Sequence, residues 1–339
     1  MDSSAALRDS ALSETAGSAQ CAPPTIGTLL RLLSAGAGGP ILMALGSGPL
    51  RTKELVERVP HYAARTVYRY AERLVQLGLV EREERAEIPS VVIYNLAPGA
   101  GTDLHTLLSA QAASWLSAQP SGQIGAQAWA SLGMLADLWE LGIVEELSRG
   151  GRSVTQLAQG CRDLTFHQIA RRTNQFLAAD LLEKRPGAGS SKHFGLTRQA
   201  RRGMGLIAAV GRWRHRHLGA SGEAGLTRGE MATVLRATLP LVRLPAHAGL
   251  RFALCVEDAE DEVLEADGAV LGATVGRNGL VHPDPEAVVA AEAWARARVG
   301  DWLDALIDGG CGGVRAGGAG ELVESFLDHL HGALWAAGR

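Results

Sequence analysis

The stretch ARTVYRYAERLVQLGLVER, residues 64–82, decides the fold because the chain carries a version of it twice. A shift of 102 residues lays it on FHQIARRTNQFLAADLLEK, residues 166–184. The match begins near Leu30, and beyond Arg82 the shift falls to 100 and then to 98, as two copies with loops of different length would show. Self-similarity at a fixed period indicates one structural unit used more than once. The first two thirds of the chain are therefore predicted to be two copies of one helical module.

The first copy has the residue spacing of a helix-turn-helix followed by a hairpin. Apolar positions at helical spacing predict helices over residues 53–59 and 64–77, and Gly78 ends the second. The period then changes to that of two strands, residues 80–85 and 91–96. This is the order of a winged helix-turn-helix, whose second helix enters the major groove of DNA. For the second copy the spacing predicts helices over 132–147, 154–160 and 165–179, a hairpin, and a closing helix over 199–218.

The net charge of −3 hides a strong asymmetry along the chain. Residues 151–220 carry 13 Lys and Arg against 3 Asp and Glu, a net of +10, whereas residues 221–339 carry 9 against 18, a net of −9. A basic block of this kind indicates a polyanionic partner, and the alternative is a solvated basic face. Its densest part, residues 212–217 (RWRHRH), is expected to be a helix C-terminus balanced by cations. A metal pair is not expected, because His215 and His217 face different sides of a helix.

Cysteine usage and hydropathy argue against several classes of protein. Four scattered cysteines form no CxxC motif, which argues against a disulfide framework and a zinc finger. No apolar run approaches the roughly 18 residues that cross a bilayer, and the N-terminus lacks a basic-then-apolar signal pattern. We expect a cytoplasmic protein without membrane contact, cofactor or metal.

Composition and spacing divide the chain into four parts. These are a flexible Ser- and Ala-rich arm over 1–22, winged-helix modules over 23–120 and 121–220, and a different unit over 226–339. For the last unit the sequence predicts helices over 228–239, 285–298, 302–307 and 319–334, strands over 250–256 and 262–266, and hairpin turns at Asp267-Gly268 and Asn278-Gly279. The predicted fold class is mainly α with small β wings, followed by an α+β unit with a curved antiparallel sheet.

Residues 21–110 resemble the HxlR family of bacterial winged-helix regulators. The resemblance is carried by GPLRTKEL at 48–55, ARTVYR at 64–69, LGLVER at 77–82, and EIP at 87–89 leading to YNLAP at 94–98. It implies DNA binding and obligate dimers that read two half-sites. It also places Cys21 where several members carry a redox-sensing cysteine. The sequence around Cys21, taken without the resemblance, favours an inert thiol. The second copy is similar to the same family in a degraded form.

The second helix of each copy supplies the candidate DNA contacts. On the first, the outward residues are predicted to be Arg65, Thr66, Tyr68, Arg69 and Arg73. The three arginines recur every four residues and form one stripe, and a guanidinium can grip guanine or phosphate through two bonds, at about 1–3 kcal/mol per base contact. The alternative is a solvated helix face with Glu72 as the ion-pair partner.

In the second copy the matching candidates lie on the helix and on the following hairpin. The helix offers Gln168, suited to adenine, and Arg171; the whole set is His167, Gln168, Arg171, Arg172, Lys192 and His193. The first hairpin has the opposite charge, with Glu81, Glu83, Glu84 and Glu87, which would repel phosphate unless Arg82 and Arg85 screen them. A fused pair of modules predicts a pseudo-dimer in one polypeptide, and the alternative is a chain that still forms a homodimer.

Residues 226–339 resemble a sterol-carrier-protein-like domain in their strands, the DPE sequence at 284–286, the helix over 302–307, a Gly-rich strand over 312–315 and a final helix. The resemblance implies a tunnel for an apolar small molecule. Candidate ligand contacts are Phe252, Trp294, Trp302 and Leu306, and the alternative for each is an ordinary core position.

The sequence therefore predicts a non-enzymatic, ligand-responsive transcription regulator whose partners are double-stranded DNA and an apolar small molecule. Two other functions stay open. One is a winged-helix scaffold used as an enzyme or as a sequestering protein for an apolar metabolite. The other is DNA repair or protection by tandem winged helices.

Overall fold

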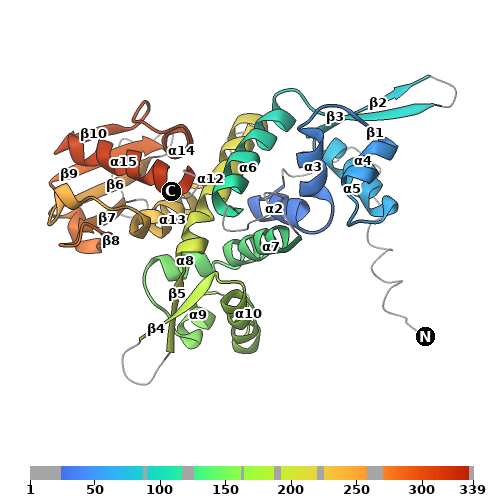
Figure 1. The fold of residues 1–339 in the computed structure, drawn as a ribbon. Helices are drawn as coiled ribbons and strands as arrows, with labels where there is room; N and C mark the ends of the chain where they lie inside the picture. The colour runs from blue at the N-terminus through green and yellow to red at the C-terminus, as the bar shows by residue number, and fades with distance from the viewer. Residues whose placement is uncertain are drawn as a thin grey trace.

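The structure is a computed structural model. It describes residues 24–86, 90–116, 126–161, 164–186, 192–219, 225–257 and 270–335. The predicted N-terminal arm, Cys21 and Glu87 lie outside the described residues. Figure 1 shows three groups of elements along the chain, with helix α12 (Met204–His217) lying between the last group and helix α6 (Ala100–Leu116).

The first group has the predicted winged-helix order. Its helices are α2 (Ile26–Ser34), α3 (Gly38–Leu45), α4 (Thr52–Arg58), α5 (Ala64–Gln76) and α6, and its strands are β1 (Leu50–Arg51), β2 (Val80–Arg85) and β3 (Val91–Leu96). Thr25 caps α2 by accepting a hydrogen bond from Thr28 N at 3.1 Å. Gly78 ends α5 in the left-handed region, at φ 67°. The strands form one antiparallel sheet in the order β1-β3-β2.

The second group repeats this order of elements. It contains α7 (Ala126–Glu140), α8 (Ile143–Ser148), α9 (Val154–Gly160), α10 (Phe166–Ala178), β4 (Leu182–Pro186), β5 (Lys192–Leu196), α11 (Arg198–Arg202) and α12. The predicted helix over 132–147 is two helices, because Gly142 takes φ 69° between α7 and α8. The predicted helix over 199–218 also divides, at Gly203, where Leu135 packs so closely that a Cβ would lie 2.8 Å from its Cδ2.

Two features of the backbone occur in both groups at positions that the internal sequence match pairs with each other. Asp180, 102 residues after Gly78, is the non-glycine described residue with positive φ, at 55°. Both residues follow the second helix of their group and turn the chain into a hairpin. An isolated bridge joins Arg152 to Phe194, where the first group pairs Leu50 with Tyr94.

The third group is an α+β unit with a mixed sheet. Its strands are β6 (Arg251–Glu257), β7 (Val270–Val275), β8 (Val281–Pro283), β9 (Ala293–Arg298) and β10 (Arg315–Gly318), in the order β10-β9-β6-β7-β8. Its helices are α13 (Arg228–Thr238), α14 (Val299–Asp308) and α15 (Gly320–Trp335), with short 3-10 turns η3 (Leu239–Leu241), η4 (Pro245–His247) and η5 (Pro285–Val288). The predicted Asn278-Gly279 turn joins β7 to β8. The predicted strand over 262–266 and the Asp267-Gly268 turn lie outside the described residues.

Two predictions for this unit are wrong. Residues 285–298 form η5 and strand β9, because Ala293, Ala295 and Ala297 alternate with outward side chains at the period of a strand. Alanine's high helix propensity concealed that alternation. The sheet is also not antiparallel throughout, since β9 runs parallel to β6 while the other pairs are antiparallel.

The three groups are joined through α12, whose buried Trp213 donates its indole hydrogen to Ala100 O at 2.8 Å. The adjacent basic run does not face solvent as a whole. Arg212, only 7% exposed, pairs with Asp304 at 3.1 Å and Asp308 at 2.8 Å on α14. Part of the positive charge of residues 151–220 is therefore neutralised by acidic residues of the third group within the same molecule.

The first two groups meet through two pairs of helices. Helix α2 lies against α7, and α6 lies against α12 (Figure 1). The fit between the groups is close: a Cβ on Gly39 would lie 2.3 Å from the ring of Trp129. No single helix among the described residues is long and apolar enough to cross a membrane; α2 and α3 pass that test only together, and they are bent by 80°.

Candidate nucleic-acid interface

Helix α5 presents the predicted arginine stripe to solvent. It buries Val67, Ala71 and Leu74 completely, which turns the opposite face outward. On that face Arg65, Tyr68, Arg69 and Arg73 are exposed and Thr66 is half-buried, so all five predicted residues lie on or beside the outer surface.

The carboxylate nearest in sequence to the stripe is turned away from it. Glu72 accepts a hydrogen bond from the hydroxyl of Tyr94 at 3.1 Å and lies 3.6 Å from Arg82, both on the hairpin. Burial first, and then the nearby Glu72 charge, raises the pKa of Tyr94, so its hydroxyl stays a donor. Among the described residues no ion pair engages the three stripe arginines. Two of them, Arg69 and Arg73, lie 5.5 and 5.8 Å from the centre of the Tyr70 ring.

Helix α10 uses its polar residues differently. His167 and Arg171 are exposed, as predicted. Gln168, however, completes a capping box: its Oε1 accepts from Thr165 N at 2.8 Å and from Thr165 Oγ1 at 3.0 Å. Bidentate reading of adenine needs the amide oxygen as well as the nitrogen, so the predicted role is unavailable in this conformation.

Arg172 is likewise engaged inside the molecule. Its Nη1 donates to Asp137 Oδ2 on α7 at 2.9 Å, and the side chain is only partly exposed. Sequence reasoning missed Phe166, the first residue of α10, which is 50% exposed and packs edge-on against the His167 ring with centres 5.9 Å apart. A large apolar residue directly after the Thr165 cap was the available signal.

The acidic first hairpin is screened in part, as the sequence allowed. Arg85 donates to Glu83 at 2.9 Å, and this bond, followed by the charge of Arg85, lowers the pKa of Glu83. Arg82 pairs with Glu84 at 3.4 Å. The second hairpin is more basic: Lys192 is exposed and His193 half-buried at the start of β5.

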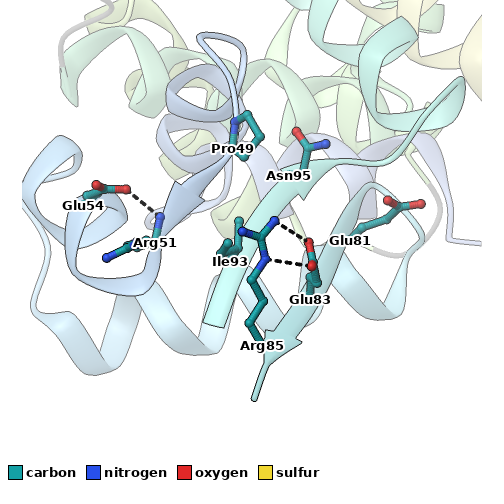
Figure 2. A pocket seen from close by; sticks show the side chains of 8 residues that line it. All are labelled: Pro49, Arg51, Glu54, Glu81, Glu83, Arg85, Ile93 and Asn95. Atoms are coloured by element: carbon teal, nitrogen blue, oxygen red, sulfur yellow. Dashed lines mark hydrogen bonds and ion pairs between the residues drawn. The ribbon is translucent and has the colours of Figure 1, made fainter. Parts of the chain in front are cut away.

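A small pocket of about 340 Å³ lies on one face of the first sheet. In Figure 2, Arg85 and Glu83 lie side by side on β2 and form an ion pair, and on another side of the pocket Glu54 accepts from the backbone nitrogen of Arg51. The whole lining is Pro49, Arg51, Glu54, Glu81, Glu83, Arg85, Ile93 and Asn95. Three carboxylates against two guanidinium groups do not favour a phosphate there.

The four candidate ligand residues of the third group do not surround one cavity. Phe252, Trp302 and Leu306 are buried in the core, where the Trp302 indole donates to Cys255 O at 3.0 Å. Trp294 lies on the opposite face of the sheet from Phe252, is 40% exposed, and has the Arg296 guanidinium 5.2 Å from its ring centre. Phe252 and Trp294 therefore do not line the same face of the sheet, and the ligand-binding role of the four residues stays a prediction.

The described cysteines have the character of unreactive thiols. Burial first, and then Glu146 and Glu145, raises the pKa of Cys161 to about 11. Burial is also the main cause of the raised pKa values of Cys255 and Cys311. In the part of the chain that the structure describes, no three His, Cys, Asp or Glu side chains gather as metal ligands.

Comparison with known proteins bears on the first group of elements. Residues 38–121 match the family model described as HxlR-like helix-turn-helix. Among solved structures, diamide-treated YodB from B. subtilis is 32% identical over 25% of this chain and 85% of its own, with a TM-score of 0.23. No curated protein matches the chain significantly. The resemblance inferred for the first copy is confirmed, and residues 38–121 are an HxlR-like helix-turn-helix segment.

Proposed function

We propose that this chain is a DNA-binding transcription regulator that reads DNA with α5. The observation that carries this proposal is the stripe of Arg65, Arg69 and Arg73, exposed on the second helix of an HxlR-like segment. Because Glu72 is held by the hairpin, the stripe keeps its charge available for phosphate or guanine.

The second group of elements is proposed to be a second winged-helix module. It has the same order of helices and strands, the same bridge before its hairpin, and a left-handed residue at the matching position. Its contribution to DNA binding is proposed to be mainly electrostatic, through Arg171, His167, Lys192 and His193 contacting phosphates.

The two modules are proposed to act as a pseudo-dimer. In a two-fold dimer each interface element meets its own counterpart. Here α2 packs on α7 and α6 packs on α12, which are counterparts in the internal match. Such a pair would present α5 and α10 to two half-sites of one operator.

The third group is proposed to modulate the pair. It grips α12 through Asp304 and Asp308, and Arg201 Nη1 donates to Ala237 O at 2.6 Å. A ligand bound at this group, apolar according to the sequence resemblance, would act only through different affinities for the DNA-competent and DNA-incompetent arrangements.

The test is an electrophoretic shift of DNA flanking the chain's own gene at about 50 mM salt, where phosphate contacts are strongest. The full chain is expected to shift the fragment, and Arg69→Ala to weaken binding by at least tenfold. Arg277→Ala, an exposed arginine in the β7–β8 turn, is the matched control. A full chain that leaves every such fragment unshifted removes the proposal.

A further inference from the structure

A cleft of about 700 Å³ lies where the three groups of elements meet. The start of α2, the α7–α8 corner, the end of α12 and the start of α13 all contribute to it. Its lining is Thr25, Ile26, Gly27, Trp139, Glu140, Gly142, Val144, Glu145, Arg214, Gly225, Thr227, Gly229, Glu230 and Thr233. The volume is within the range of small-molecule sites.

The lining defines the chemistry of a suitable ligand. Glu140, Glu145 and Glu230 line the cleft together with Arg214, and Arg31 and Arg149, outside the lining, pair with Glu140 and Glu145. An ammonium group in the cleft would compete with these arginines for the carboxylates. Trp139 also lines the cleft, and an indole can attract a cation or an apolar body. Arg214 is 8% exposed, donates Nη1 to Gly225 O at 3.2 Å, and has an Nε without a hydrogen-bond partner. Because this Nε is itself buried, a ligand oxygen would reach it only if the Arg214 side chain turned toward the cleft.

Glu140, on one wall of the cleft, belongs to a series of linked ion pairs. Thr25 Oγ1 donates to Glu140 Oε1 at 3.1 Å, and Arg31 Nη1 lies 2.5 Å from Glu140 Oε2. Arg31 Nε also donates to Asp137 Oδ1 at 3.0 Å, while Arg172 holds Asp137 Oδ2 at 2.9 Å. These ion pairs connect the cleft, through α2 and α7, to helix α10.

The Glu140 side chain occupies space beside α2 that is open because residue 27 is a glycine. A Cβ on Gly27 would lie about 2 Å from the Glu140 carboxyl group, so a larger residue there would push that side chain away. The absence of a side chain at Gly27 therefore lets Glu140 reach Thr25 and Arg31 while still lining the cleft.

We infer that the cleft is an effector site for a small organic amine with an apolar body and an acceptor oxygen, coupled to α10 through Glu140, Arg31, Asp137 and Arg172. An ammonium group competes with Arg31 for Glu140. Arg31, once released, can bind both oxygens of Asp137 as a bidentate pair and displace Arg172. Helix α10 then loses its tie to α7, and DNA affinity falls; this last step rests on the proposed function.

Binding is tested by calorimetry on the full chain with tyramine, which carries the ammonium, the ring and a phenol oxygen. Tyrosol, in which a hydroxyl replaces the amine, is the matched neutral probe and is expected to bind at least tenfold more weakly. Glu230→Gln is expected to weaken tyramine binding about tenfold, while the amide oxygen still accepts from Thr227 N and keeps the α13 cap. Glu324→Gln, on the exposed face of α15, is the control. Equal binding of tyrosol, or no loss in Glu230→Gln, overturns the site.

Coupling is tested by fluorescence anisotropy of an operator fragment with and without saturating tyramine. The wild-type chain is expected to bind DNA about tenfold more weakly with the amine, the size of a typical coupling between sites. Asp137→Asn is expected to bind tyramine but lose this difference. Amine binding with unchanged or increased DNA affinity overturns the relay. Calorimetric binding in a chain that never binds DNA instead removes the proposed function and leaves the site standing.

Discussion

Helices α5 and α10 hold the same place in the same order of elements, yet they use their polar side chains in opposite ways. On α5 the arginines are exposed and unpaired among the described residues, and the neighbouring carboxylate is turned to the hairpin. On α10, Gln168 caps the helix and Arg172 ties it to α7. The comparison teaches that a matched position need not keep a matched role, because a polar group already satisfied inside the protein has less to offer a ligand.

The largest expected effect separates the two helices directly. Replacing Arg65, Arg69 and Arg73 together by Ala is expected to lower DNA affinity more than a hundredfold, since each arginine contributes roughly 1–3 kcal/mol as a base contact. Anisotropy titrations at fixed salt would measure the loss, with circular dichroism as the check on folding. A loss below tenfold would mean that α5 is not the principal reader.

Arg171→Ala is expected to have a smaller and different effect. Affinity should fall about three- to tenfold for every sequence alike, and the salt dependence should flatten by about one phosphate contact. Titrations from 50 to 200 mM salt on specific and unrelated DNA would show it. If Arg171→Ala instead changes which sequence is preferred, α10 reads bases and the contrast with α5 fails.

Gln168→Ala is expected to change stability and leave DNA specificity as it is. Losing the capping-box partner should lower the free energy of unfolding by about 0.5–1 kcal/mol. Urea denaturation would measure this, with Asn174→Ala, an exposed amide on the same helix, as the control. An unchanged midpoint together with altered base preference would restore the adenine-reading role.

The hairpins give the smallest effect. Glu83→Gln removes one negative charge from the first hairpin, so DNA affinity is expected to rise about two- to threefold at low salt and the gain to vanish at high salt. Glu324→Gln, far along the chain on α15, should show no such gain. An equal rise in both variants would indicate only a change in net charge.

The exposed face of α5 and the two hairpins could be predicted from the sequence, because apolar residues recur about every 3.6 residues in a helix and every 2 in a strand, whatever the fold. The sequence also contains the signal for the cap at Thr165 and Gln168, because Thr-x-x-Gln is a capping-box motif, but this motif was not used in the prediction. The Arg172–Asp137 and Arg212–Asp304 pairs join residues 35 and 92 positions apart, and no local pattern encodes such contacts. Strand β9 was missed because its alternation is made of alanine and arginine, both good helix formers.

The closing helix α12 makes the chain difficult to take apart. Removing the last group of elements would take both carboxylates from Arg212 and the carbonyl partner from Arg201, and it would expose to water the surface of α12 that now packs on α14. Gln111 would also lose its bond to Leu334 O. Evolution of this architecture by trimming or swapping its parts is therefore constrained: a new sensory unit would have to bring its own acidic helix to the same guanidinium groups.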